Sequence, residues 1–177
     1  MADSEGTGGG TLQALLEVGA LLGGDASLAA ELRLAHEDAA SFVASYEERF
    51  CDWPGWEAAP LPWLALVTGL VARGLAAELA LEEDEAADVM WAVDQLFWTS
   101  DAGELPGGWA WVTPEQRSSA ELLLLAVAAR LSAQGWTLGG FELDAAEAFV
   151  AAEGEIFARC QRLLAESGWP AMGPVKL

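Results

Sequence analysis

Hydrophobic residues recur at helical intervals along most of the chain. The clearest stripe predicts a helix over 86–97, because its apolar positions fall on one face at a period of about 3.6 residues. Its members are Ala86, Val89, Met90, Val93, Leu96 and Phe97. A second stripe predicts a helix over 39–50, and its members are Ala39, Phe42, Val43, Tyr46 and Phe50.

Further helices are predicted toward both ends of the chain. Regular leucines over 11–22 predict a first helix, which Gly23 ends, and Asp25 or Ser27 would cap the next one. The segment 63–71 is apolar on nearly every face, which is typical of a helix deep in a core. Thr113 as cap and Pro114 in the first turn predict a long helix that continues to Gln134. A last stripe over 156–164 predicts a C-terminal helix.

Strand patterns are few. Residues 75–81 and 136–143 favour strands, and Gly139-Gly140 indicates a bulge in the second of them. Residues 148–152 fit either a returning hairpin strand or a helix that begins at Asp144. We therefore predict an α+β fold, a helix-dominated single domain with a small antiparallel sheet of two to four strands. We expect a disordered lead-in over 1–10, the domain over 11–170 and a C-terminal tail over 171–177.

Several short motifs, in this order, resemble an uncharacterised bacterial family, the domain of unknown function numbered 6630. They are Pro62 to Leu66, Gly69, Arg73 to Leu79, the acidic Glu82 to Asp84, Val89, Trp91, Leu96, Leu131 to Gly135, Leu143-Asp144, and Gln161 to Gly168. The resemblance covers most of residues 11–170. It implies an α+β fold with a small antiparallel sheet, and it implies no activity.

Charge narrows the classes of partner. The chain has 28 acidic against 8 basic side chains, a net charge of −20, and Lys176 is its only lysine. Such a surface disfavours nucleic acids and anionic membranes, which need Lys and Arg, and it permits a basic protein partner or serves solubility alone. The N-terminus lacks a signal-peptide pattern, and the apolar stretch 58–72 is shorter than the roughly 20 residues of a membrane span. Two distant cysteines look like buried small hydrophobes in a reducing compartment, so we expect a cytoplasmic protein.

Chemistry-bearing residues form no recognisable catalytic motif. His36 is the single histidine and is interpreted as a surface or helix-junction residue. Glu82, Asp84, Glu85 and Asp88 are the candidate ligands for a hard divalent cation, although acids at a helix start are more simply a solvated terminus. We predict no catalytic residue and no cofactor.

Nine tryptophans are the most unusual feature after the charge. Trp63, Trp91 and Trp136 occur on apolar segments and are predicted to be core residues. Four others occur in the two long loops and are the candidate ligand or partner contacts: Trp53, Trp56, Trp109 and Trp111. The simpler interpretation is that these loops fold back and bury their rings.

Together these features favour a non-catalytic acidic protein-binding domain, for example an immunity or antitoxin-like partner of a basic protein. One alternative is a carboxylate-dependent hydrolase with a divalent metal. Another is a small-ligand or carbohydrate binder that uses the loop tryptophans. The sequence alone favours the binding protein over an enzyme.

Overall fold

A computed structural model describes residues 11–51, 56–81, 84–99, 105, 107–142 and 147–175. The helices are α1 (Leu12–Leu21), α2 (Ala26–Glu37), α3 (Ala39–Tyr46), α4 (Leu61–Val71), α5 (Ala86–Thr99), α6 (Ala120–Ser132) and α7 (Gly154–Glu166). The strands are β1 (Ala77–Leu79), β2 (Trp136–Glu142), β3 (Glu147–Glu153) and β4 (Met172–Pro174). Three 3₁₀ turns, η1 (Glu47–Arg49), η2 (Trp56–Ala58) and η3 (Gln116–Ser118), complete these elements. The predicted α+β, helix-dominated fold is confirmed.

The strands form one antiparallel sheet in the order β1-β3-β2-β4. β2 and β3 pair without interruption from Trp136 opposite Glu153 to Glu142 opposite Glu147, so the bulge predicted at Gly139-Gly140 is wrong. Gly139 serves close packing instead. A Cβ at this position would lie 2.3 Å from the carbonyl oxygen of Gly173 and 2.4 Å from the ring of Phe157.

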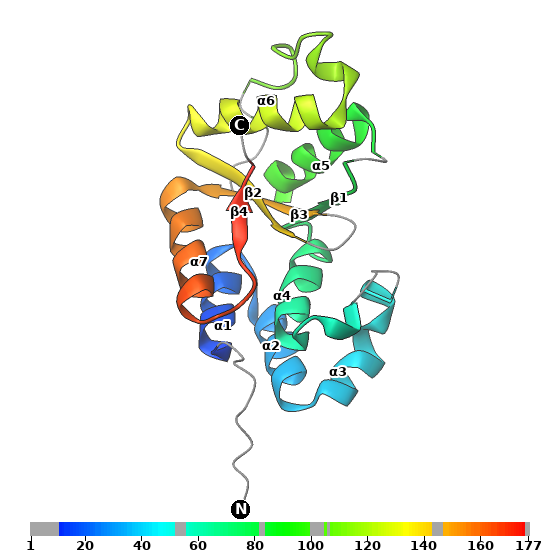
Figure 1. The fold of residues 1–177 in the computed structure, drawn as a ribbon, viewed down its shortest axis with the longest axis vertical. Helices are drawn as coiled ribbons and strands as arrows, with labels where there is room; N and C mark the ends of the chain where they lie inside the picture. Colours follow the sequence, from blue (N-terminus) through cyan, green and yellow to red (C-terminus); the bar gives the residue numbers. More distant parts are fainter. Residues whose placement is uncertain are drawn as a thin grey trace, which may run out of the picture.

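Helices cover both faces of the sheet (Figure 1). We call the face under α1, α2, α4 and α7 the four-helix side, and α3 packs against α2 in the same core. We call the face under α5 and α6 the two-helix side. Side chains of β3 alternate between them, because successive residues of a strand point to opposite faces. Val150 and Ala152 pack in the core of the four-helix side, whereas Phe149 packs in the core of the two-helix side. Both faces of the sheet are therefore buried.

The boundaries of two helices differ from the predicted ones. Thr113 does cap a turn, since its Oγ1 accepts a hydrogen bond from the backbone N–H of Gln116, but that turn is only η3. Ser119 then adopts an extended conformation, and its side chain accepts a hydrogen bond from Leu122 N to open α6. The predicted continuous helix from Pro114 to Gln134 is wrong, because a serine favours such a cap over a helix interior.

Other helices and strands begin or end a few residues away from their predicted boundaries. The helix predicted over 39–50 is α3 followed by the 3₁₀ turn η1. α4 begins at Leu61, two residues before the predicted helix over 63–71, because Pro62 is tolerated in a first helical turn. The alternative left open for 148–152 is settled as strand β3. Met172–Pro174, within the expected C-terminal tail, form β4 against β2.

Candidate functional site

The outer face of α5 carries two large exposed side chains. Trp91 is 64% exposed and Trp98 is 78% exposed. They are seven residues apart, about two helical turns, so they lie on the same face. The opposite face of α5 is buried and includes Val93 and Phe97. The prediction that Trp91 belongs to the core is therefore wrong: it is apolar, but it lies off the buried stripe.

Carboxylates flank these indoles on α5. Asp88 and Asp94 are exposed and lie three residues before and three residues after Trp91. Asp94 also accepts a hydrogen bond from the indole N–H of Trp109, with Nε1 at 2.9 Å from Oδ1 and 3.0 Å from Oδ2. We call Trp91, Trp98 and Trp109, with Asp88 and Asp94, the tryptophan face.

The loop before η3 packs its rings together beside this face. The rings of Trp109 and Trp111 stack with centroids 6.3 Å apart and planes at 22°. The guanidinium of Arg130 lies 4.8 Å from the centroid of the Trp111 ring, and the Trp111 N–H donates to the carbonyl oxygen of Gly108 at 2.6 Å. Both rings are half-buried against the core of the two-helix side. They cover part of that core.

The four tryptophans predicted as contacts do not form one site. Trp56 packs on the four-helix side, with its ring centroid 4.9 Å from that of Phe50, whereas Trp109 and Trp111 lie on the two-helix side. Trp53 lies outside the described residues. Of the core predictions, Trp63 is buried and Trp136 is half-buried.

The predicted metal ligands near the start of α5 make local hydrogen bonds. Asp84 accepts from the backbone N–H of Ala80 at 2.6 Å, and Asp88 accepts from the backbone N–H of Glu85 at 2.8 Å. Glu82 lies outside the described residues. Over the described ranges, no three His, Cys, Asp or Glu side chains group in a way that could hold a metal ion.

Three further residues have side chains that could act as nucleophiles or bases, namely His36, Cys51 and Cys160. His36 is exposed in the last turn of α2, as predicted. Cys160 is buried, and burial raises the pKa of its thiol to about 11, which makes it a poor nucleophile. Cys51 is exposed, contrary to the prediction that both thiols are buried.

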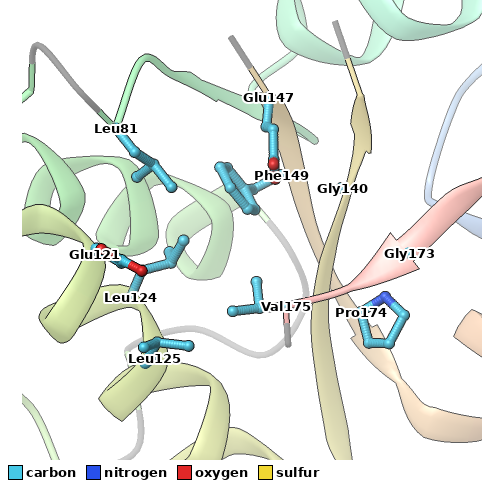
Figure 2. Close-up of a pocket in the computed structure, with 10 residues that line it drawn as sticks. All are labelled: Leu81, Glu121, Leu124, Leu125, Gly140, Glu147, Phe149, Gly173, Pro174 and Val175. Carbon is cyan, nitrogen blue, oxygen red and sulfur yellow. The ribbon is translucent and has the colours of Figure 1, made fainter. Parts of the chain in front are cut away.

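A cavity of about 210 Å³ lies between α6 and the sheet (Figure 2). Most of its lining residues are hydrophobic or glycine, its surface is nearly as polar as apolar, and Glu121 and Glu147 are its charged members. The lining residues are Leu81, Glu121, Leu124, Leu125, Gly140, Glu147, Phe149, Gly173, Pro174 and Val175. The sequence did not predict this cavity, because its walls come from five separate parts of the chain.

A charged cluster on the four-helix side was also missed. Glu31 is only 6% exposed, and its carboxylate accepts hydrogen bonds from Arg49 at 2.6 Å and from Arg73 at 2.7 Å. Burial alone would raise the pKa of Glu31, but the hydrogen bonds and charges of the two arginines outweigh it and hold that pKa below its ordinary value. Arg73 also reaches Asp25 and Ser27, so the cluster ties α2 to the end of α4 and to η1.

Comparison with known proteins identifies the family of this chain. The model of the family described as Domain of unknown function (DUF6630) matches residues 13–173. The chain belongs to the DUF6630 family. This match spans nearly all of the described fold, and the description assigns no activity. Neither a curated protein nor a solved structure matches this DUF6630 domain significantly. No helix within the described part of the chain has the length and hydrophobicity needed to cross a membrane.

Proposed function

We propose that this DUF6630 domain is a non-catalytic protein-binding domain whose tryptophan face receives a basic partner. The observation that carries the proposal is the exposure of Trp91 and Trp98, at 64% and 78%, on one helix face. Tryptophan is enriched at the energetic centres of protein interfaces, because a large rigid ring is buried there at a small entropic cost. Each square ångström of apolar surface that a partner removes from water contributes about 25 cal/mol of favourable free energy to the contact.

The charges around the two rings favour a cationic partner. Asp88 and Asp94 flank Trp91 on the same face, and the whole chain has a net charge of −20. An arginine suits this arrangement, because its planar guanidinium stacks on an indole and also pairs with a carboxylate. A second copy of the chain is disfavoured, since two surfaces of the same strong charge repel each other.

Two arginines near the face already have partners of their own. Arg130 stacks on Trp111, and Arg117 donates to the carbonyl oxygen of Trp109 at 3.4 Å. The Arg130 contact shows that this part of the molecule accommodates a guanidinium over an indole ring. A partner arginine on Trp91 or Trp98 would make the same kind of contact.

The test uses a fluorescently labelled helical peptide with arginines at intervals of three and four residues, and its lysine and glutamate counterparts. Fluorescence anisotropy measures the binding of each peptide to the parent domain, to the double variant Trp91→Ser/Trp98→Ser and to Leu122→Ser. Leu122 is the matched control, because it is an exposed hydrophobic residue on α6 rather than α5.

We expect the arginine peptide to bind most tightly, with an affinity that falls as salt rises. The double tryptophan variant should bind it about tenfold more weakly, since loss of one strong contact changes affinity by this order. Leu122→Ser should bind as the parent does. Equal affinity of the parent and the double variant would reduce the interaction to non-specific charge attraction and would refute the proposal.

A further inference from the structure

The outer face of α5 repeats one chemical unit. Asp88 lies three residues before Trp91, and Asp94 lies four residues before Trp98. Residues three or four apart on a helix are neighbours on its surface, with Cβ atoms about 5–6 Å apart. All four side chains are exposed. The tryptophan face therefore carries two acid–indole pairs in succession, each with a carboxylate beside a ring.

Both carboxylates can accept more hydrogen bonds than they do within the domain. Asp88 accepts from the backbone N–H of Glu85 through Oδ2, and Asp94 accepts from the indole N–H of Trp109. An ionised carboxylate offers about four acceptor sites on its two oxygens, and a neutral donor does not cancel its charge. Each pair can therefore bind a flat cation by its carboxylate and by its ring together.

The seven-residue interval between the two rings sets the spacing of the groups that can meet them. A rise of about 1.5 Å per residue puts Trp91 and Trp98 about 10.5 Å apart along the axis of α5. Side chains on one side of an extended strand recur at about 6.6 and 13 Å, so a strand laid along α5 matches one ring but not both. A polyproline helix repeats at about 9 Å. A second α-helix laid along α5 matches the interval, from its residue i to its residue i+7.

We propose that the partner is an α-helix that lies along α5 and carries two arginines seven residues apart, one for each acid–indole pair. This rests on the proposed function, to which it adds the shape of the partner and the spacing of its arginines. Each guanidinium stacks on one indole and hydrogen-bonds to the carboxylate beside it, as its flat shape and forked donors allow. Lysine fits less well, because its ammonium group is a compact and strongly hydrated charge.

The test compares two stapled helical peptides of identical composition, and therefore of identical net charge. In one peptide the two arginines are seven residues apart and share a face. In the other they are five residues apart and point about 140° away from each other. Fluorescence anisotropy should show that the parent domain binds the seven-residue spacing about fivefold more tightly, as one additional exposed cation–π contact would give. A proline-rich peptide with arginines three residues apart should bind more weakly than the seven-residue spacing.

Single substitutions show whether the two pairs act together. Trp91→Ser and Trp98→Ser should each abolish the preference for the seven-residue spacing, because only one ring then remains. Leu122→Ser should keep the preference, since Leu122 is exposed on α6 rather than on α5. Asp94→Asn removes a charge but keeps an acceptor for the Trp109 N–H, so it should reduce the preference without releasing the loop.

The outcomes separate the spacing of the arginines from the protein-binding function itself. Equal affinity of the parent for both spacings, with weaker binding of both by the double variant Trp91→Ser/Trp98→Ser, would overturn the helical partner and leave the protein-binding function in place. Tighter binding of the proline-rich peptide than of the seven-residue spacing would also overturn the helical partner. If the double variant binds both helical peptides as the parent does, the proposed function is refuted, and the helical partner with it.

Discussion

The two sides of the sheet have equally buried cores, but they differ at their outer surfaces. On the four-helix side, Phe42, Phe50 and Phe141 are fully buried, and the buried Glu31 is held by two arginines. On the two-helix side, α5 leaves two indoles in solvent, and a cavity separates part of α6 from the strands. Tight packing serves stability, whereas exposed apolar rings and unfilled space are features of surfaces that bind. On the proposed function, the four-helix side contributes mainly stability and the two-helix side carries the recognition surface.

Removal of a ring from the four-helix core should have the largest effect. Phe141 is fully buried and meets the ring of Trp63 edge-on at 6.3 Å. Phe141→Ala should lower the free energy of unfolding by about 3–5 kcal/mol, measured by urea denaturation. Phe149→Ala on the two-helix side should fall at the lower end of that range, because its ring already borders a cavity. A larger loss for Phe149 would contradict the contrast between the two sides.

Loss of the buried Glu31 carboxylate should have the second-largest effect on stability. Glu31→Ala leaves Arg49 and Arg73 without their shared acceptor, and both keep partial access to water. We expect a loss of about 2–3 kcal/mol in the free energy of unfolding, somewhat below the range for a fully buried pair. The exposed pair between Glu17 and Arg159 is the control, and Glu17→Ala should cost less than about 1 kcal/mol. Equal losses would show that the cluster at Glu31 is no more than a surface pair.

The same carboxylate should make stability depend on pH. The pKa of Glu31 is lower in the folded chain than its ordinary value of 4.5, so the unfolded chain binds a proton first as the pH falls. Its contribution is therefore complete above about pH 4.5 and is lost as the pH falls through the folded pKa. Asp25, with a pKa lowered to about 2 chiefly by the hydrogen bond from Ser27, acts in the same direction at lower pH. Urea midpoints between pH 7 and pH 3 should fall less steeply in Glu31→Gln than in the parent, and parallel profiles would contradict this.

The sequence predicts the helices and strands on both sides of the sheet better than it predicts which of their residues are exposed, buried or next to a cavity. The stripe from Ala86 to Phe97 predicts α5 correctly, and its geometry already places Trp91 outside the stripe. Trp91 was assigned to the core because of its hydrophobicity alone, and that assignment is wrong. The cavity was beyond prediction, because it depends on β4 pairing with β2 and on Gly173 lying opposite Gly140. The burial of Glu31 was equally hidden, since its partners are 18 and 42 residues away.

Loss of the hydrogen bond that joins the loop over 107–112 to α5 should have a moderate effect on stability. Asp94→Ala removes the acceptor of the Trp109 indole N–H, an exposed hydrogen bond to a charged group. The free energy of unfolding should fall by about 1 kcal/mol. Gln95→Ala, an exposed neighbour on the same helix, is the control and should leave stability unchanged. Hydrogen exchange should report faster opening of residues 107–112 in Asp94→Ala alone.

The smallest effect on stability is expected where the largest rings are exposed. Trp91→Ser and Trp98→Ser should each change the free energy of unfolding by less than about 0.5 kcal/mol, because surface substitutions away from packed contacts rarely do more. Trp63→Ser, at a buried indole, should cost several kcal/mol and is the contrast within the same residue type. Acrylamide quenching provides an independent measure, since the two α5 variants should each lose a readily quenched, red-shifted part of the emission. A loss of more than about 1 kcal/mol in either variant would mean that the ring packs on the protein itself. In that case the outer face of α5 would belong to the stable part of the molecule, and the division between the two sides of the sheet would fail.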